Sequence, residues 1–161
     1  TENSNFEFYP QADALFTMRK DCALVTLIAD CTPLLLSSKK AIAAVHVGRK
    51  GLVSGIFEET LKRFIVNGIS AEEIEAEIGP AICGNCYELD QKTYQEVIAA
   101  SPEAGLDSSR CCVDVSAGLK AKLRKAGIPF RASDLCVNHD PGYFSYRRDA
   151  VTGRQAGVIW Q

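Results

Sequence analysis

Residues 34–47, with the sequence Leu-Leu-Leu-Ser-Ser-Lys-Lys-Ala-Ile-Ala-Ala-Val-His-Val, decide the fold of this chain. Two runs of apolar residues flank four polar residues, which is typical of a β-hairpin. With these four residues as the loop, Leu36 pairs with Ala41, and the same register sets Cys31 directly opposite His46. Directly opposed side chains in an antiparallel pair have Cβ atoms roughly 4.5–5.5 Å apart. The hairpin therefore predicts that a thiol and an imidazole meet.

The segments around the hairpin mix strands with helices. Residues 22–29 form a continuous apolar run, and we expect a strand that is buried on both faces. Apolar residues then recur at helical spacing from Leu52 to Ile65, and Asn67-Gly68 ends that helix. Because helices and strands do not alternate strictly, the pattern predicts an α+β fold with a mixed β-sheet core and flanking helices. The other expected elements are a capped turn from Ser70, strands at 74–78 and 157–160, and helices at 90–100 and 114–126.

The composition favours one globular domain that acts on small molecules. The 161 residues are 47% hydrophobic and 24% charged, so one core is large enough without disulfides, and we expect a single domain over 1–161. A net charge of -2 argues against a nucleic acid or an anionic membrane as the main partner. The seven cysteines, several of them in apolar runs, indicate reduced thiols and a cytoplasmic location. The chain starts at Thr1 without a methionine, and we expect it to be truncated at the N-terminus.

Cys31 and His46 are the strongest candidates for chemistry. The chain has only two histidines, His46 and His139, and His46 ends a strand just before a glycine loop. Cys31 follows Asp30 at the point where the chain leaves the strand, so its sulfur can be exposed. A thiolate beside an imidazole is either a zinc or copper ligand pair or a nucleophile with its base. A core histidine and a buried cysteine are the structural alternatives, and two ligands do not complete a catalytic zinc site.

The remaining cysteines give weaker signals. Cys83-Gly-Asn-Cys86 has the C-x-x-C spacing of half a zinc ribbon or a redox pair, but no second C-x-x-C follows. We interpret it as a loop beside the site. The other cysteines are expected to be apolar fillers, because each lies in or beside an apolar stretch without a ligand-like partner; they are Cys22, Cys111, Cys112 and Cys136.

Two basic segments are candidates for binding an anion. Gly48-Arg49-Lys50-Gly51 opens a helix, so free N–H groups and two cations would meet an anion such as phosphate there. The alternative is an ordinary turn with solvated charges. Arg147 and Arg148 lie among aromatic residues, and in a strand their side chains would point to opposite sides. One would then bind substrate while the other pairs with Asp149, and a wholly structural ion pair is the alternative.

These motifs, taken in order, resemble the YfiH-like laccase-domain family, whose members are called multicopper polyphenol oxidoreductases and also purine nucleoside phosphorylases. The resemblance runs nearly end to end, and its fold is similar to that of bacterial toxin deamidases. The motifs that carry it include Ala29-Asp-Cys31-Thr-Pro33, His46-x-Gly48, Gly79-Pro-Ala-Ile82, Tyr87-Glu88, Phe144-Ser-Tyr-Arg-Arg-Asp149 and Ile159-Trp160.

The resemblance implies a metal site in which Cys31 and His46 coordinate zinc, or copper in some accounts. A further histidine comes from an upstream Gln-Val-His segment that is absent here, which supports the expected truncation. Arg49 and Lys50 replace the Trp-Arg of the family loop, so an aromatic surface is lost while positive charge is kept. The residues expected to bind substrate or phosphate are Asp30, Arg49, Lys50, Tyr87, Arg147 and Arg148.

The function implied by the resemblance is a zinc-dependent purine nucleoside phosphorylase and adenosine deaminase, with purine nucleosides and phosphate as its small-molecule partners. A copper-dependent polyphenol oxidase, as the family name states, is an alternative, although true multicopper oxidation needs more imidazoles than two histidines provide. A metal-free Cys-His hydrolase or amidase linked to peptidoglycan precursor editing is another. The chain can also be an incomplete, non-catalytic fragment.

Overall fold

The computed structural model describes residues 12–161, which form nine strands, five α-helices and three short 3₁₀ helices. The strands are β1 (Ala14–Thr17), β2 (Ala23–Ile28), β3 (Thr32–Ser37), β4 (Ile42–Val47), β5 (Glu75–Ile78), β6 (Gly105–Asp107), β7 (Cys112–Val113), β8 (Phe130–Ala132) and β9 (Gln155–Trp160). The α-helices are α1 (Arg49–Ser54), α2 (Ile56–Val66), α3 (Gln91–Ala100), α4 (Val115–Lys125) and α5 (Tyr146–Asp149). The 3₁₀ helices are η1 (Ala71–Glu73), η2 (Gly84–Cys86) and η3 (Pro102–Ala104).

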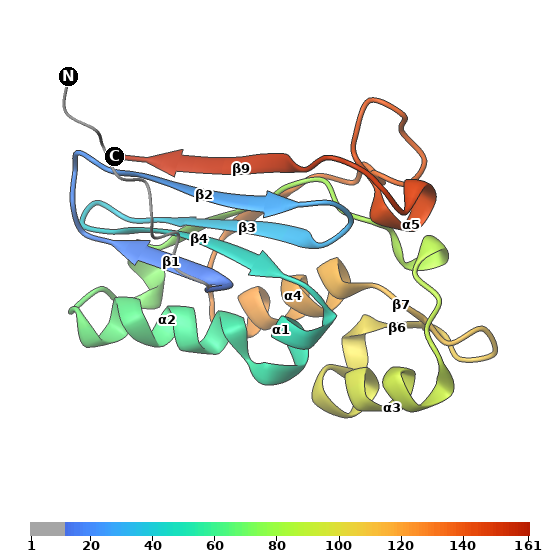
Figure 1. Cartoon of the computed structure of the whole chain (residues 1–161). Coiled ribbons are helices and arrows are strands. Elements are labelled where there is room, and N and C mark those ends of the chain that lie inside the picture. The colour runs from blue at the N-terminus through green and yellow to red at the C-terminus, as the bar shows by residue number, and fades with distance from the viewer. Residues whose placement is uncertain (1–11) are drawn as a thin grey trace, which may run out of the picture.

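The described residues stack in three layers (Figure 1). A five-stranded sheet in the order β1-β4-β3-β5-β8 forms the middle layer; its strands are antiparallel except for β5 and β8. Helices α1, α2 and α4 cover one face, and the antiparallel ribbon of β2 and β9 covers the other. The mixed sheet with flanking helices confirms the expected α+β class.

The β3–β4 hairpin forms, but its register differs from the expected one. Leu36 pairs with Ala43 rather than Ala41, and His46 pairs with Pro33 rather than Cys31. The difference arises because the loop begins one residue later and ends one residue later, with a hydroxyl-capped turn in which the Ser38 side chain accepts from the Ala41 N–H at 3.0 Å. A shift of two residues keeps every side chain on its expected face, since strand side chains alternate with a period of two.

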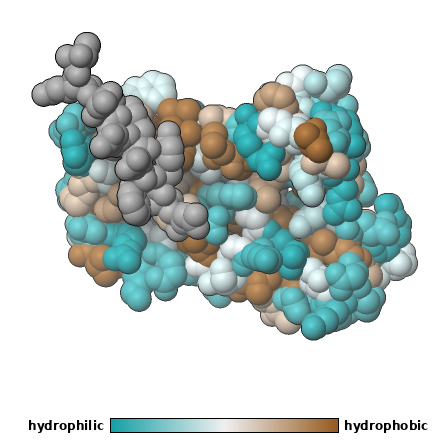
Figure 2. Space-filling view, in the orientation of Figure 1, coloured by the Kyte–Doolittle hydropathy of each residue, from teal (hydrophilic) through white to brown (hydrophobic). Residues whose placement is uncertain are grey.

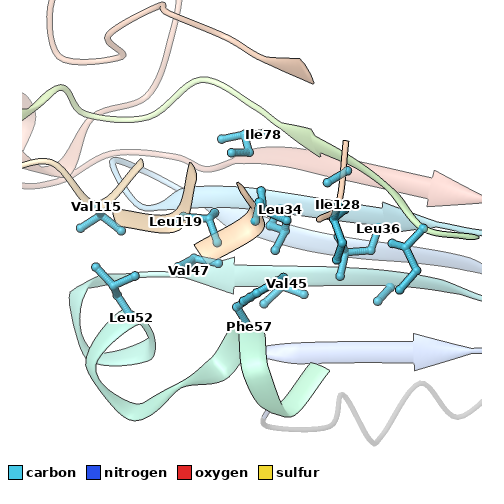
Figure 3. Close-up of a cluster of buried hydrophobic side chains, with 14 of the residues drawn as sticks. Leu34, Leu36, Val45, Val47, Leu52, Phe57, Ile78, Val115, Leu119 and Ile128 are labelled. Atoms are coloured by element: carbon cyan, nitrogen blue, oxygen red, sulfur yellow. The ribbon is translucent and has the colours of Figure 1, made fainter. Parts of the chain in front are cut away.

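The core lies between the middle sheet and the helices (Figure 3). Val45 and Val47 of β4 point to the helical side, where they meet Leu52 and Phe57. The alternate residues Ile42 and Ala44 point to the ribbon and pack with Leu24. The two apolar faces explain why the run at 41–47 has no polar residue before His46. Further buried members of the helical-side core are Leu34, Leu36, Phe64, Ile78, Leu119 and Leu123.

The β2 strand is buried on one face only, so the expectation of burial on both faces was wrong. Leu24 and Ile28 are buried, whereas Val25 and Leu27 are 43% and 57% exposed. The partner strand β9 repeats this pattern, with Trp160 72% exposed. Apolar residues on the outer side give the brown patch over the ribbon in Figure 2. An apolar run is therefore a sign of a strand here, but it does not reveal how many faces other elements cover.

The helices follow the sequence with two exceptions. The expected single helix from Leu52 breaks at Gly55, whose φ of 79° ends α1 and starts α2. Residues 146–149 form the short helix α5 instead of a strand, with Ser145 as its N-cap. The capping box at Ser70 and the helices over 91–100 and 115–125 lie as expected. In the part of the chain that the structure describes, no helix has the length and apolar character needed to cross a membrane.

Substitution of Leu34 by alanine should lower the free energy of unfolding by about 2–5 kcal/mol, because its fully buried side chain would leave a cavity between sheet and helices. Urea denaturation followed by circular dichroism measures this loss. The same substitution at Leu27, on the exposed face of β2, should cost about 1 kcal/mol or less. Equal losses at the two positions would contradict the placement of the core.

Candidate functional site

Cys31 and His46 meet on the ribbon-side face of the sheet, where β3 begins and β4 ends. They are diagonal neighbours rather than a direct pair, and the register continues to Gly48 opposite Cys31. A Cβ atom placed on Gly48 would lie 3.1 Å from the Cys31 Sγ and 3.7 Å from the His46 Nε2. The absence of a side chain at Gly48 therefore leaves the space that the thiol and the imidazole share.

Asp13 completes the immediate surroundings of His46. The Asp13 carbonyl accepts from the His46 backbone N–H at 2.7 Å, which extends the β1–β4 ladder by one residue. The Asp13 carboxylate lies 3.6 Å from the His46 Nδ1, so the Nε2 is the ring nitrogen that faces Cys31. A carboxylate behind one ring nitrogen is the usual partner of a histidine that binds a metal through the other.

Two adjoining hollows of about 390 Å³ and 270 Å³ open around this pair. Both are lined by Cys31, Gly48, Arg49 and Tyr87. The larger hollow extends toward α5, and the smaller extends over His46 toward Asp13. Together they form one cleft, and every sequence-predicted site residue except Arg148 lines it; these residues are Asp30, Cys31, His46, Arg49, Lys50, Tyr87 and Arg147.

Asp30 holds the wall of the cleft in place. Its backbone has a φ of 88°, a left-handed conformation that is uncommon outside glycine. Its carboxylate accepts from the Ser145 hydroxyl and from the Arg147 backbone N–H, both at 2.6 Å, and its carbonyl accepts from the Ile82 N–H at 2.9 Å. One residue thus joins the turn before Cys31 to two distant segments. Asp30 was expected to bind substrate. It lines the cleft, but both oxygens of its carboxylate already accept hydrogen bonds from the protein.

The two arginines of α5 separate into different environments. The Arg147 guanidinium lies 5.3 Å from the centre of the Tyr87 ring and donates to the Glu88 carbonyl at 3.2 Å, at the edge of the cleft. Arg148 points away from the cleft and pairs with Asp149. Its other donors bind backbone carbonyls of the preceding loop, those of Val137, Asn138, Asp140 and Tyr143. The expectation that Arg148 contacts substrate therefore has no support in this arrangement, and its contacts are those of a structural ion pair.

Arg49 and Lys50 open α1 as expected, directly after Gly48. Both line the hollow over His46, and Arg49 lines the larger hollow as well. The helix they start has only six residues, so its dipole is small, and the two side-chain charges are the main source of positive potential at this end of the cleft. These charges suit an anionic group bound beside Cys31.

The described residues around Cys31 favour its neutral thiol form. Burial raises the pKa of the Cys31 thiol, and the negative charges of Asp30 and Asp13 raise it further, against a smaller opposing effect of Arg154. Nucleophilic cysteines instead have a lowered pKa, next to cations or a helix N-terminus. A further positive charge beside this thiol, such as a metal ion, would favour its thiolate form.

A second group of sulfur and nitrogen donors lies beside the cleft. Cys83, Cys86, Cys136 and His139 each offer one donor atom, and these atoms lie within 4.8 Å of one another. Cys136 is buried, as expected of an apolar filler, but it does not lack ligand-like partners, because its sulfur accepts from the Cys83 N–H at 3.3 Å and lies near the other donors. The loop 83–86 lies next to the site as expected, because the preceding residue, Ile82, donates a backbone hydrogen bond to the Asp30 carbonyl. A set of three thiols and an imidazole at this spacing could hold a metal.

Comparisons with known proteins identify the family. The profile described as multi-copper polyphenol oxidoreductase laccase matches residues 1–161. The chain belongs to this family. Its relatives include two proteins named purine nucleoside phosphorylase, from Streptomyces griseus and Streptomyces coelicolor, each 40% identical over 156 residues. A crystal structure of a Neisseria meningitidis protein is 30% identical and superposes with a TM-score of 0.85.

The match covers most of this chain but only part of these laccase-family relatives. It includes 94% of this chain with 63% of the S. griseus protein and 64% of the S. coelicolor protein. For the Neisseria structure the shares are 96% and 66%. The chain thus spans less than two thirds of the length of the curated relatives. The chain therefore shares the fold of the Neisseria protein over most of its own length, and about a third of each longer relative lies outside the match.

Sequence reasoning missed Asp13 and His139 among the residues of interest. Asp13 belongs to Ala12-Asp13-Ala14, a further motif of the family resemblance, but its role depends on the β1–β4 pairing, which places it opposite His46. His139 lies three residues after Cys136, so a C-x-x-H signal complements the C-x-x-C of 83–86. We looked only for a second C-x-x-C and therefore did not consider Cys136-x-x-His139.

Replacing Asp30 by alanine should lower the free energy of unfolding by about 1–3 kcal/mol, because the Arg147 N–H would lose its acceptor and the fully buried Ser145 hydroxyl would keep only the longer contact with Asn138. Urea denaturation measures the loss, and hydrogen exchange should quicken in 146–149. Asp30→Asn, which keeps an acceptor oxygen and tolerates a positive φ, should lose less. Wild-type stability and exchange in the alanine variant would show that the carboxylate does not hold α5.

Proposed function

We propose that this chain carries the substrate cleft of a zinc-dependent purine nucleoside phosphorylase, with Cys31 and His46 at its centre. The observation that carries the proposal is the juxtaposition of this thiol-imidazole pair with the cationic and aromatic residues of one cleft. The names of the two Streptomyces relatives support this reaction over others. The larger hollow, at about 390 Å³, is in the range of small-molecule sites.

The donor set fits a zinc ion in part. Cys31 and His46 would be two of its ligands, and Asp13 would orient the imidazole from behind. A catalytic zinc site usually has three protein ligands, and we expect the third from the Gln-Val-His segment that the family resemblance implies. Zinc in such a site acts as a Lewis acid and lowers the pKa of water. The raised pKa of Cys31, caused first by burial, suits a thiol that ionises only beside a cation.

Phosphate would bind where Arg49, Lys50 and Arg147 line the cleft. Arginine binds phosphate with a planar fork of N–H donors, and lysine adds a point charge. In phosphorolysis a phosphate oxygen forms a bond to the ribose anomeric carbon while the bond from that carbon to the purine nitrogen breaks. The purine leaves with the electron pair and takes up a proton, which the hydrogen phosphate ion supplies through water as it becomes the phosphate ester. The three cations would position the attacking oxygen and offset the charge that it brings.

The purine would lie against the apolar and aromatic part of the larger hollow. Ile82 and Val115 form its apolar lining, and Tyr87 and Tyr146 supply aromatic surface. Tyr146 is 60% exposed, so it can turn toward a bound base. These tyrosines would take over the stacking role of the tryptophan that Arg49 replaces in the family loop.

Deamination of adenosine is the finer part of the proposal. It replaces the amino group of the purine by a water oxygen and releases ammonia, and a zinc ion held by Cys31 and His46 would supply the Lewis acid for that chemistry. A metal-free cysteine hydrolase is less well supported. Such an enzyme needs a thiolate, whereas burial and two carboxylates raise the pKa of Cys31.

The test measures release of the base from inosine or adenosine with and without inorganic phosphate, in zinc-containing buffer, on the full-length protein that carries the third zinc ligand. We expect release of hypoxanthine or adenine only with phosphate, and its loss in Cys31→Ala. Cys22→Ala is the matched control, because that cysteine lies on the ribbon away from the cleft. Activity that is unchanged in Cys31→Ala would overturn this site assignment, and base release without phosphate would show hydrolysis instead.

Gly48→Ala should abolish the activity while leaving the free energy of unfolding within about 1 kcal/mol of the wild-type value. The new methyl group would occupy the space between the Cys31 Sγ and the His46 Nε2, and the backbone φ of -85° accepts alanine without strain. Base release and thermal unfolding, measured on the same sample, check the two parts. A fully active Gly48→Ala variant would mean that this space is not used.

A further inference from the structure

Two tight turns beside the cleft carry the second group of donors. In the first, the Cys86 N–H donates to the Cys83 carbonyl at 3.0 Å, and in the second the His139 N–H donates to the Cys136 carbonyl at 3.1 Å. Each turn therefore places a first cysteine and a donor three residues later on the same side. The C-x-x-C and C-x-x-H spacings are those of structural zinc sites.

The sheet brings the two turns together. Strands β5 and β8 run parallel, and the pairing continues past their ends in a bridge between Ala81 and Cys136. Because the carboxyl ends of parallel strands meet at the same edge, Cys83 and Cys136 follow them side by side. The Val137 N–H donates to the Ala81 carbonyl at 3.1 Å and fixes this register. The backbone thus holds both turns where their donors converge.

The donor atoms have the spacing of a ligand shell. Two sulfurs bound to one tetrahedral zinc ion lie roughly 3.8 Å apart, since each Zn–S bond is about 2.3 Å long. The four donors lie within 4.8 Å of one another, with the Cys86 Sγ and the His139 Nε2 2.9 Å apart. Small movements would place all four around one ion. A hydrophobic role does not explain this convergence, because His139 is exposed and three thiols face it.

Further hydrogen bonds support the thiols from outside. The Cys83 N–H donates to the Cys136 Sγ at 3.3 Å, and the Asn138 Nδ2 donates to the Cys86 Sγ at 3.4 Å. N–H donors directed at cysteine sulfurs stabilise their metal-bound form and orient them.

We propose that Cys83, Cys86, Cys136 and His139 bind one zinc ion in a closed, tetrahedral structural site, separate from the Cys31–His46 pair. Four protein ligands leave no position for water or substrate, so this ion has no part in catalysis. Three thiolates and an imidazole in tetrahedral geometry favour zinc over copper(II), which takes tetragonal sites, and over magnesium or calcium, which take oxygen ligands.

The ion would fasten one wall of the cleft. Cys83 follows Ile82, which lines the cleft and donates to Asp30, and Cys86 precedes Tyr87. On the other side, Asn138 is within 3.4 Å of the Ser145 hydroxyl, which donates to Asp30. Both turns are therefore tied to the same carboxylate, and a bond through zinc would lock them together.

The experiment uses the 161-residue chain with Cys31→Ala, so that only the proposed site holds zinc. After loading with zinc sulfate and dialysis, we expect elemental analysis to find one zinc ion per chain. Adding Cys83→Ser and Cys136→Ser should remove it, whereas adding Cys22→Ser and Cys111→Ser should not. Zinc should also raise the unfolding temperature of the Cys31→Ala chain and leave that of the Cys83→Ser/Cys136→Ser chain unchanged.

Thiol alkylation tests the site without changing its ligands. In the zinc-loaded chain Cys83, Cys86 and Cys136 should resist iodoacetamide until a chelator is added, while Cys22 reacts in both states, as read by mass spectrometry. This measurement does not require that the serine variants fold. A Cys31→Ala chain that retains no zinc, a folded double-serine chain that retains it, or a disulfide among the three cysteines would overturn the site.

Discussion

The candidate cleft depends on the carboxylate of Asp30 more than on any other single group. It accepts hydrogen bonds from the Ser145 hydroxyl and from the Arg147 N–H in the first turn of α5, while the carbonyl of the same residue accepts from the Ile82 N–H. The turn that exposes Cys31 is thereby fixed to segments 52 and 115 residues away in the chain. These contacts hold Asp30 in its left-handed backbone conformation, with a φ of 88°. The position of Arg147 over Tyr87 follows from this attachment.

The sequence was sufficient to predict β2, the β3–β4 hairpin, β5, α3, α4 and β9 and to bring Cys31 and His46 to one place, whereas β1, β6, β7 and β8 were not expected. It was not sufficient for the hairpin register, because the choice between loops of equal length depends on the Ser38–Ala41 turn. The thiol-imidazole prediction survives this error, since an even shift leaves both side chains on one face. The strand predicted for Arg147 failed for a different reason: the contact that makes it helical comes from Asp30, far away in sequence.

The group around Cys136 shows where reasoning from local patterns ends. Cys83-x-x-Cys86 and Cys136-x-x-His139 are each ordinary four-residue motifs, and nothing within either indicates the other. Their meeting depends on the parallel pairing of β5 and β8, which the sequence does not reveal. The contacts of Arg148 likewise depend on residues that its local sequence does not indicate. It stands beside Arg147 in the sequence, yet the carbonyls of a neighbouring loop take up its donors.

The two donor groups differ in the loop-closure entropy that the chain loses when they come together. Cys31 and His46 lie on adjacent strands of one hairpin, so closing that hairpin brings them together over a short loop. The sulfurs of Cys83 and Cys136 are separated by 53 residues, and loop-closure entropy increases with loop length. The hairpin pair therefore requires the closure of a short loop only, whereas the long-range cluster also requires the parallel pairing of β5 with β8.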